Sequence, residues 1–532
     1  MPSTKKLLSI TNLKKYFPIA KSSIFQRQQY YVKANEDISL DIYEGETLGI
    51  VGESGCGKST LGRVLLQLYE QTAGTTMYYG MSRAELAPRY VTDTLRHAKR
   101  YISKLHAAQA RADAASAKVS QLGEAATFFD LQNKNLAVAE YQTAQAHIAK
   151  ILGGFLVRDT EQGAALLYRK ARLEERAAAL SDRIRDIELM LDEAEGGTAD
   201  DGKPANASQL ARLKGRCDRL TRERDGLNAQ IREAEQSIAA IKQAHLDDVE
   251  FQRYEAMLDD GIDLARLKYS EMRILRKDLQ IIFQDPYSSL NPRFTIGQII
   301  EEGLVTHKFF RHGSPKMREH VVRTMKECGL QEYMLFRYPH QFSGGQRQRI
   351  SIARALAVHP KFVVCDECVS ALDVSIQSQI INLLQELKQK EHLTYMFISH
   401  DLSVVRYISD RICVMYLGNV VELADAATVF GDPRHPYTVA LLSSIPTTDM
   451  ESLKKERILL EGSIPSPVKP PDGCKFHTRC WMACDKCRRV PPPLAEIEPG
   501  HFVACHFPER KLDENGNYLF EMPKTEKKSA KE

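Results

Sequence analysis

The segment G-E-S-G-C-G-K-S-T at residues 52–60 has the residue types and spacing of a phosphate-binding loop. Its glycines allow backbone N–H groups to turn towards phosphate oxygens, and a helix beginning at the end of the loop would add partial positive charge. Lys58 would reach the β- and γ-phosphates of a nucleotide, and Ser59 would place its hydroxyl on Mg²⁺. The residues expected to bind nucleotide are Gly52, Glu53, Ser54, Gly55, Cys56, Gly57, Lys58, Ser59 and Thr60.

A second group of polar residues would complete the chemistry of phosphate hydrolysis. The apolar residues 362–365 are followed by Asp366, which can hold Mg²⁺ through water, and by Glu367, which can polarise the attacking water. Gln284 can sense the metal and the γ-phosphate, and His400 can contact the γ-phosphate from the end of a neighbouring strand. We therefore predict catalytic roles for Glu367, His400 and Gln284, and a Mg²⁺ site formed by Ser59, Gln284 and Asp366.

The segment S-G-G-Q at residues 343–346 begins a predicted helix and offers a second anion-binding N-terminus. One nucleotide rarely needs two such sites from one chain. Two chains packed head to tail would use both, with the phosphate loop of one facing the S-G-G-Q segment of the other. The sequence therefore predicts that Ser343, Gly344, Gly345 and Gln346 contribute to a nucleotide site shared between two chains.

The elements that must position these residues are strands alternating with helices. An apolar run at residues 47–51 indicates a buried strand before the phosphate loop, and an apolar face that includes Leu61 and Leu65 indicates a helix after it. Further strands are expected to end at Asp366 and His400, and a hairpin is expected to turn at residues 418–419. This alternation predicts an α/β core with a largely parallel sheet.

The composition changes after Gly80, and residues 82–268 are rich in Ala, Leu, Arg, Glu and Gln. Apolar residues recur at three- and four-residue steps in two series, Leu166 to Ala194 and Leu210 to Ile241, separated by a polar breaker. This pattern is typical of an antiparallel coiled-coil hairpin. We expect the segment to dock a partner, and a passive, solvated spacer is the alternative.

Length, net charge, apolar runs and cysteine distribution limit the class of protein. With 532 residues, the chain is expected to form two or three domains, and its formal net charge of +4 argues neither for nor against nucleic acid. The absence of a long apolar run or a signal-peptide pattern predicts a soluble or peripheral protein of the cytosol. Five of the 11 cysteines lie between Cys474 and Cys505, and such a cluster in a cytosolic chain favours metal over disulfides.

Taken together, these motifs resemble the ATP-binding subunit of an ABC transporter. The resemblance covers residues 5–80 and 275–510, and its markers include V-V-C-D-E, S-A-L-D ending at Asp373, and the Q, S-G-G-Q and H positions described above. Finer markers are similar to the F-type subunit of the oligopeptide/dipeptide/nickel importers, namely Y-E-G-E-T-L-G, F-Q-D-P-Y-S-S-L-N-P-R, A-L-D-V-S-I-Q and H-P-Y-T-V-A-L-L. The resemblance implies an ATPase that drives uptake of oligo- or dipeptides across the cytoplasmic membrane.

The family implies a P-loop ABC ATPase fold with a RecA-like core, an antiparallel β subdomain and a helical subdomain. In this chain the fold would carry an inserted coiled coil and a small Cys-rich C-terminal domain. The expected parts are the first ATPase segment at 1–81, the helical coiled-coil insertion at 82–268, the second ATPase segment at 269–430, the C-terminal domain at 431–510 and a disordered tail at 511–532.

The resemblance also implies partners. ATP and Mg²⁺ would be sandwiched between this subunit and a second, homologous ATPase, as a heterodimer, with Asp373 near the nucleotide. Tyr16 is a candidate to stack on the adenine ring, and ordinary packing is the alternative. Two transmembrane permeases and an extracellular or periplasmic substrate-binding protein would complete an assembly at the cytoplasmic face of the membrane, without nucleic acid.

Four cysteines match a pattern in the C-terminal domain of many peptide-importer ATPases: Cys474, Cys480, Cys487 and Cys505. The resemblance allows a [4Fe–4S] cluster, since four thiolates suit that cofactor. Zinc is the competing metal, and unliganded cysteines are a further alternative. Cys484 is an additional, unassigned thiol.

Cys368 departs from the family, which usually has proline after the catalytic glutamate. Cys365 and Cys368 thus form a C-x-x-C. We expect no metal there, because side chains at i and i+3 of a strand point to opposite faces.

The inserted coiled coil raises an alternative function, because coiled-coil ABC ATPases also act on DNA or chromosomes. In those families the coiled coil follows the glutamine loop, whereas Gln284 lies after the insertion here. The predicted hairpin tip also lacks a C-x-x-C zinc hook. Both features favour the transporter.

Overall fold

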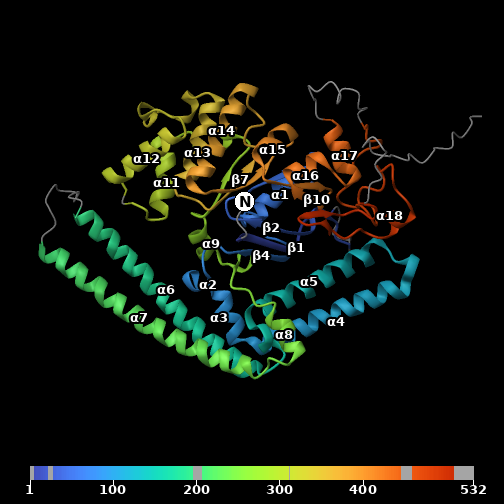
Figure 1. Ribbon diagram of the computed structural model, residues 1–532, viewed down its shortest axis with the longest axis horizontal. Helices are drawn as coiled ribbons and strands as arrows, with labels where there is room; N and C mark the ends of the chain where they lie inside the picture. The colour runs from blue at the N-terminus through green and yellow to red at the C-terminus, as the bar shows by residue number, and fades with distance from the viewer. Residues whose placement is uncertain (1–4, 22–27, 196–206, 311, 445–457, 509–532) are drawn as a thin grey trace, which may run out of the picture.

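The computed structural model describes residues 5–21, 28–195, 207–310, 312–444 and 458–508. These residues form two sheets, with one group of helices around the larger sheet and a second group extending from the smaller one (Figure 1). None of the helices in these ranges combines the length and the apolar character that crossing a membrane requires.

Among the described residues, eight strands form the larger sheet, in the order β11-β12-β10-β9-β3-β8-β7-β6. The strands from β9 to β6 run parallel, as the α/β pattern predicted. β3, β7 and β8 are buried along their whole length, which explains their continuous apolar sequences. The strands are β3 (Thr47–Val51), β6 (Leu279–Ile282), β7 (Phe362–Asp366), β8 (Thr394–Ile398), β9 (Arg411–Tyr416), β10 (Asn419–Asp425), β11 (Ala495–Glu498) and β12 (His501–Val503).

The hairpin between β9 and β10 turns one residue earlier than predicted. Leu417 and Gly418 both have positive φ angles, of 43° and 77°. Asn419 is already the first residue of β10 and pairs with Tyr416. A two-residue loop with both φ angles positive matches the twist of the flanking strands.

The smaller sheet is antiparallel, and its described strands follow the order β2-β1-β4-β5. Its strands are β1 (Lys6–Pro18), β2 (Tyr31–Tyr43), β4 (Ala73–Tyr78) and β5 (Ile262–Asp263). Buried residues of β1, such as Leu8 and Ile10, pack with Leu61 of α1 (Lys58–Leu65), the helix that follows the phosphate loop. This apolar cluster joins the smaller sheet to the nucleotide-binding elements.

Helices follow most strands of the larger sheet. The group between β6 and β7 lies at one end of the molecule (Figure 1). It consists of α10 (Pro286–Ser289), α11 (Ile296–Thr306), α12 (Pro315–Glu327) and α13 (Gly344–Leu356). The later helices are α14 (Val374–Glu391), α15 (Leu402–Ile408), α16 (Ala426–Gly431), α17 (Pro436–Ser443) and α18 (Asp485–Arg489).

A long helical segment lies between β4 and β6. It contains α2 (Arg83–Leu86), α3 (Arg89–Arg96), α4 (Ala98–Leu122), α5 (Phe128–Leu152), α6 (Thr160–Glu195), α7 (Ala207–Gln243), α8 (Val249–Glu255) and α9 (Tyr269–Leu275). Two long helix pairs, α4–α5 and α6–α7, diverge beneath the sheets (Figure 1). In the second pair, Leu180 and Ile184 of α6 pack with Leu220 and Leu227 of α7.

Two elements of this segment were not predicted from the sequence, and some of the predictions concern residues that the structure does not describe. α5 had no periodic signature, because its apolar residues are spread around the helix. β5 lies within the stretch predicted to be helical, because Ile262 and Asp263 pair with β4. Most of the predicted breaker between α6 and α7, and the predicted tail at 511–532, lie outside the described residues.

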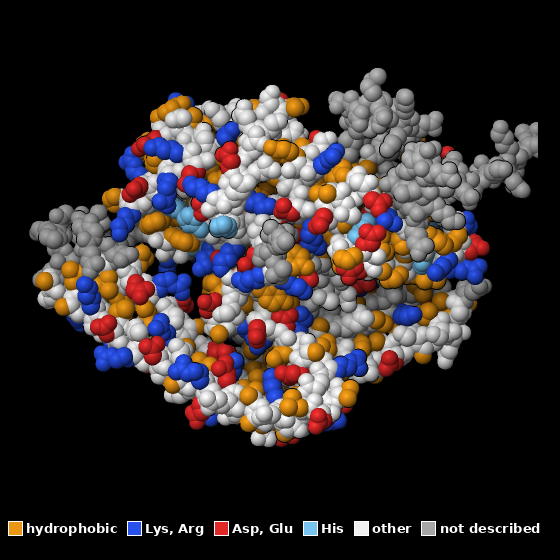
Figure 2. Space-filling model, viewed as in Figure 1, with side chains coloured by type: hydrophobic (Ala, Val, Ile, Leu, Met, Phe, Trp, Pro, Cys, Tyr) orange, Lys and Arg blue, Asp and Glu red, His pale blue; other side chains and the backbone are white. Residues whose placement is uncertain are grey.

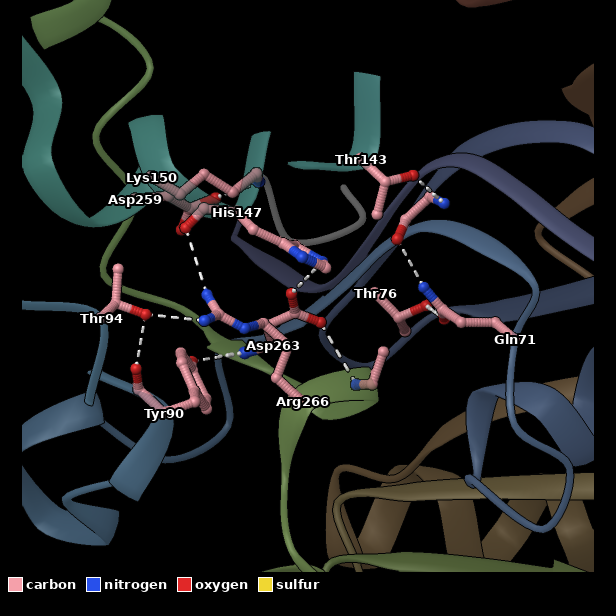
Figure 3. Close-up of polar contacts among 12 residues, drawn as sticks. Gln71, Thr76, Tyr90, Thr94, Thr143, His147, Lys150, Asp259, Asp263 and Arg266 are labelled. Atoms are coloured by element: carbon pink, nitrogen blue, oxygen red, sulfur yellow. Dashed lines mark hydrogen bonds and ion pairs between the residues drawn. The ribbon is translucent and has the colours of Figure 1, made fainter. Parts of the chain in front are cut away.

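Polar contacts fasten the helical segment to the smaller sheet (Figure 3). The Gly74 N–H of β4 donates a hydrogen bond to the hydroxyl of Thr143 of α5 at 2.8 Å, and His147 lies 3.2 Å from Asp263 of β5. Within the segment, Lys150 lies 2.8 Å from Asp259, and Arg266 donates a hydrogen bond to Thr94 at 2.7 Å. Because the segment leaves from β4 and returns beside it as β5, the larger sheet stays uninterrupted.

The C-terminal residues join the ATPase core through β12, which pairs with β10 at the edge of the larger sheet. Phe476 is buried, and its ring lies 5.3 Å from the ring of Tyr416 and 5.4 Å from that of Tyr437. The Cys-containing segment therefore packs on the same sheet that carries the phosphate loop.

Candidate active site

The phosphate loop connects β3 to α1, and two of its glycines are required by the backbone. Gly52 and Gly57 have φ angles of 148° and 102°. A Cβ atom on Gly52 would lie 2.2 Å from the carbonyl oxygen of Met415, and one on Gly57 would lie 2.1 Å from that of Ala34. The loop can therefore follow this path only with glycine at both positions.

Lys58 follows the phosphate loop in sequence, and its side chain contacts the backbone of that loop. Its Nζ donates hydrogen bonds to the carbonyl oxygens of Gly52 at 2.8 Å and Glu53 at 3.1 Å. The side chain is buried, so its ammonium group sits beside the backbone that would surround the phosphates. This position is suited to contact with the β- and γ-phosphates.

Asp366 ends β7 and carries a carboxylate that fits a metal ion. The residue is 2 % exposed, and Arg63 Nη2 lies 3.3 Å from Oδ2. Its Oδ1 is buried and has no hydrogen-bond partner within the described parts of the chain. A buried carboxylate oxygen without a partner is costly unless a cation or water satisfies it. Asp366 and the hydroxyl of Ser59 would therefore hold Mg²⁺, which would neutralise charge on the phosphate oxygens.

Three predicted catalytic residues come together at the carboxyl ends of neighbouring strands. Gln284, after β6, donates a hydrogen bond from Nε2 to Glu367 Oε2 at 2.8 Å. His400 Nδ1, after β8, lies 3.6 Å from the same oxygen. Parallel strands explain this meeting, because their carboxyl ends share one edge of the sheet. The arrangement can orient Glu367 towards a water molecule.

The S-G-G-Q segment forms the start of α13. Ser343 is the N-cap, and its hydroxyl accepts the Gln346 N–H at 3.4 Å, while Gln346 Oε1 accepts the Ser343 N–H at 3.1 Å. Gly345 is required by packing, since a Cβ there would lie 2.5 Å from Ile376. Within the described ranges, no hydrogen bond or ion pair joins this segment to the phosphate loop of its own chain.

Two other predicted nucleotide contacts have structural partners. Asp373 is the N-cap of α14, and its Oδ1 accepts the Ile376 N–H at 3.0 Å. Tyr16 is 4 % exposed, and its hydroxyl donates to Glu36 Oε2 at 2.5 Å. Stacking of Tyr16 on adenine does not fit this conformation, because the ring is covered by its neighbours, including Lys33 at 5.6 Å.

The structure also shows contacts to the phosphate loop that the sequence did not reveal. Arg479 Nη1 lies 2.8 Å from Glu53 Oε2, and the Glu53 N–H donates to the hydroxyl of Tyr437 at 2.8 Å. Burial opposes the charge of Arg479, but hydrogen bonds to Glu53 and Tyr416 raise its pKa. Tyr437 belongs to the H-P-Y-T motif, which was the available signal, whereas nothing in the sequence pointed to Arg479.

The expectation for Cys365 and Cys368 needs a correction. The two thiols do not point to opposite faces, because β7 ends at Asp366 and the chain then turns at Glu367, whose φ is 50°. Hydrogen bonding with Cys368, together with burial, raises the pKa of Cys365 well above its usual value. Both thiols lie in the apolar core.

The four clustered cysteines, Cys474, Cys480, Cys487 and Cys505, line one cavity of about 20 Å³. Burial raises the pKa of Cys480 to about 12 and that of Cys505 to about 11. Over the described ranges, no three Cys, His, Asp or Glu side chains are grouped so that they could hold a metal ion.

Comparison with known proteins agrees with this geometry. The ABC transporter family matches residues 35–155 and 219–370, and the C-terminal region of the oligopeptide/dipeptide transporters matches residues 421–487. The matched residues include the phosphate loop, the S-G-G-Q segment and three of the four clustered cysteines.

Individual relatives are described as ATP-binding proteins of peptide transport or import. The putative oligopeptide transport ATP-binding protein YkfD of Bacillus subtilis is 53% identical over 248 residues, 46% of this chain and 75% of the relative. The oligopeptide transport ATP-binding protein AppF of the same organism is 52% identical over 254 residues, 47% of this chain and 76% of the relative. A putative peptide import ATP-binding protein of Brucella ovis is 52% identical over 247 residues, 46% of this chain and 77% of the relative. This chain therefore belongs to the ABC transporter family, as an ATP-hydrolysing subunit with the C-terminal region of the oligopeptide/dipeptide transporters.

Proposed function

We propose that this subunit uses ATP hydrolysis to power the import of oligo- or dipeptides. The observation that carries the proposal is the meeting of Gln284, Glu367 and His400 beside the phosphate loop of a chain whose relatives are peptide transport ATP-binding proteins. The substrate class comes from those relatives, since a transporter's ATPase does not itself select the peptide.

In the proposed reaction, Lys58 and the backbone N–H groups of the loop hold the β- and γ-phosphates. Glu367 orients a water molecule for attack on the γ-phosphorus, and Gln284 and His400 hold the carboxylate through the contacts described above. Asp366 and Ser59 would hold Mg²⁺, which would supply positive charge to neutralise the phosphates. Each side chain thus positions or stabilises charge, and no covalent intermediate with the protein is needed.

We place the second half of the nucleotide site on another ATPase subunit, in a heterodimer. The support is the S-G-G-Q segment, whose helix N-terminus has no hydrogen bond to its own phosphate loop within the described ranges. The free N–H groups of a helix N-terminus favour a phosphate ligand. In the partner subunit, the corresponding segment would close over the nucleotide bound here.

The remaining partners are two transmembrane permeases and a substrate-binding protein outside the membrane, which places this subunit at the cytoplasmic face. Exposed aromatic side chains support a docking surface on the helical group between β6 and β7. Tyr287 is 68 % exposed, and Phe336 is 68 % exposed. Tyr287 lies in the F-Q-D-P-Y-S-S-L-N-P-R motif, which we expect to meet a permease.

The function is tested by reconstituting the complete transporter in liposomes. Addition of binding protein and peptide should stimulate ATP hydrolysis and accumulate peptide in the lumen that corresponds to the cytoplasm. Lys58→Ala should abolish both, whereas Lys104→Ala, an exposed change on α4, should leave both intact. ATP hydrolysis that no peptide stimulates, across a panel of lengths, would contradict the assigned substrate class.

We further propose that residues 82–268 form a coiled-coil insertion that docks a partner. The packing of α6 on α7 through Leu180, Ile184, Leu220 and Leu227 supports the coiled coil. The direct test is replacement of 82–268 by a short Gly/Ser linker. Transporter assembly or its regulation should change while nucleotide binding persists, and an unchanged transporter would favour a passive spacer.

We also propose that Cys474, Cys480, Cys487 and Cys505 hold a structural [4Fe–4S] cluster. The support is that all four cysteines line the same small cavity, so they gather at one place in the fold. Anaerobic purification should yield a brown protein with about four irons per chain. Cys480→Ser should lose the iron and Cys484→Ser should keep it, whereas stoichiometric zinc without iron would replace this assignment.

A further inference from the structure

A cavity of about 440 Å³ lies where the helical segment meets the smaller sheet and the Cys-containing segment. α5 forms one wall, β1 and β2 form a second, and residues 473–476 and 491–494 form a third. Figure 1 shows α5 running beside β1 and towards the C-terminal region. The lining includes no residue of the phosphate loop and none of Gln284, Asp366, Glu367 and His400, so this cavity is distinct from the ATP site.

The charges that line the cavity are unbalanced. Lys14, Lys33, Lys134 and Lys475 face only two carboxylates, those of Glu36 and Asp37, which leaves a net charge of +2. The side chains of Lys14 and Lys33 are 10 % and 11 % exposed, so water screens them weakly.

The two carboxylates are already engaged by the lysines of the sheet. Glu36 lies 2.6 Å from Lys14 Nζ and 3.7 Å from Lys33 Nζ, and Asp37 lies 3.7 Å from Lys14 Nζ. Burial would raise the pKa of Glu36, but Lys14 and Lys33 hold it below its usual value, so the carboxylate stays ionised.

The other two lysines have no carboxylate partner within the described ranges. Lys475 donates a hydrogen bond to the carbonyl oxygen of Pro471 at 2.6 Å, and Lys134 of α5 has no ion pair. Burial and the nearby charge of Lys33 lower the pKa of Lys475. Two ammonium groups from separate parts of the chain therefore share a partly enclosed space, and among the described residues neither forms an ion pair with the carboxylates that line it.

We propose that this cavity binds a small organic molecule that carries a phosphate monoester. A phosphate dianion would balance the net charge of +2, and lysine ammonium groups are common phosphate ligands. The volume lies within the range of small-molecule sites, roughly 300–1,000 Å³. Asn135 and Gln142 would supply hydrogen bonds to the rest of the molecule, and Val138 and Leu494 would supply apolar contact.

Such a ligand would contact α5, β2 and the Cys-containing segment together. Binding would therefore hold the helical segment against the ATPase core, because Lys134 lies on α5 and Lys475 lies on the Cys-containing segment. This gives the helical segment a second point of attachment, besides the contacts of Thr143 with β4 and of His147 with β5 (Figure 3).

The test is calorimetric titration of the full-length protein with ribose 5-phosphate, with ribose as the neutral control. Ribose 5-phosphate should bind saturably at one site per chain, and ribose should not bind. Lys134→Gln with Lys475→Gln should weaken binding by at least about tenfold, because charge-assisted hydrogen bonds are lost. Lys104→Gln, an exposed change on α4 outside the cavity, should have no effect.

Two further variants separate this site from folding effects and from the ATP site. Val138→Trp fills the cavity while keeping all four lysines, and it should also abolish binding. Lys58→Ala should retain ribose 5-phosphate binding. The proposal is overturned if the wild-type protein shows no saturable binding, if the double lysine variant binds as the wild type does, or if ATP displaces the probe competitively.

Discussion

Glu367 has a φ angle of 50°, in the left-handed region that a glutamate seldom occupies. Such strain persists only where the surroundings impose it, and it is concentrated at functional sites. Here the constraints are the Glu367 N–H bond to Ile398 at 3.0 Å and the side-chain bond from Gln284 at 2.8 Å. The backbone turn thus holds the carboxylate where Gln284 and His400 contact it.

Glu367→Gln should therefore stop hydrolysis without preventing ATP binding. The amide keeps the shape of the side chain but cannot polarise water, so the hydrolysis rate should fall by about 10²–10⁴-fold. Single-turnover hydrolysis and equilibrium ATP binding measure the two effects. Glu319→Gln, an exposed change on α12, is the matched control, and near-normal hydrolysis by Glu367→Gln would contradict the assigned role.

Arg479→Ala should weaken ATP binding even though Arg479 lies far from the loop in sequence. The change removes the ion pair with Glu53, so the loop loses a support from the C-terminal segment. We expect KM for ATP to rise roughly tenfold, with partial recovery in Arg479→Lys. If Glu53→Ala and Arg479→Ala prove fully additive in a double-mutant cycle, the two residues do not act together.

Cys484 should react with iodoacetamide before Cys328. A backbone hydrogen bond at Cys487 lowers the pKa of Cys484, whereas burial raises that of Cys328 to about 12. Since the thiolate is the nucleophile, Cys484 should be alkylated first at pH 8, and the difference should shrink as pH rises. Peptide mass spectrometry of a time course gives the order, and equal rates at pH 8 would refute it.

At the scale of elements, the α6–α7 pair has its own apolar seam and touches the ATPase core lightly. Lys308 Nζ lies 3.5 Å from Asp186 Oδ1, but both side chains are at least half exposed. An exposed ion pair of this kind contributes little stability, about 0–1 kcal/mol. On the face shown in Figure 2, Lys and Arg side chains of the lower helices are interspersed with Asp and Glu. The α6–α7 pair is therefore stabilised mainly by the apolar contacts between its own two helices.

Ile184→Asp should consequently unfold the helix pair while sparing the ATP site. Ile184 is 5 % exposed within the seam, and an unpaired carboxylate there would cost several kcal/mol. Limited proteolysis should cleave within 160–243, while ATP affinity stays within about twofold. Arg183→Asp, on the neighbouring exposed position, should resist cleavage as the wild type does. Loss of ATP binding in an otherwise folded Ile184→Asp protein would show that the pair supports the core.

At the scale of the whole molecule, we propose that the chain carries two complementary halves of a nucleotide site. One is the phosphate loop with Asp366 and Glu367, and the other is the start of α13. The segment 343–346 belongs to the helical group at one end of the molecule, beside α11 and α12 (Figure 1). Head-to-tail association would use both halves, as the sequence predicted.

The isolated subunit should therefore hydrolyse ATP only when it associates with a second ATPase subunit. At low concentration, specific activity should rise with protein concentration, because active sites form at the dimer interface. Addition of the homologous second ATPase should raise activity further, and a second ATPase with arginine in place of the serine that corresponds to Ser343 should not. Analytical ultracentrifugation fixes the oligomeric state, and full turnover by a strict monomer would exclude the shared site.

The residues expected to bind and hydrolyse ATP could largely be predicted from short, contiguous stretches of the sequence. The phosphate loop, the strand ending in Asp366 and Glu367, and the S-G-G-Q start of α13 each depend on contiguous residues, whose backbone preferences and burial pattern can be recognised in isolation. The same holds for the apolar series of α6 and α7, whose repeat predicts their packing on each other.

Contacts between distant segments were decided only by the tertiary structure. Arg479 reaches Glu53 because β12 and Phe476 fasten the C-terminal segment to the sheet, and no local pattern encodes that approach. Tyr16 is covered because Lys33 and Glu36 of another strand pack on it, and Cys365 meets Cys368 because the strand ends between them. The lysine-lined cavity likewise needs α5, whose apolar residues have no helical period, to lie against the smaller sheet, which it contacts at β4. Sequence periodicity reports which face of an element is buried, whereas the partner of that face depends on how the whole chain packs.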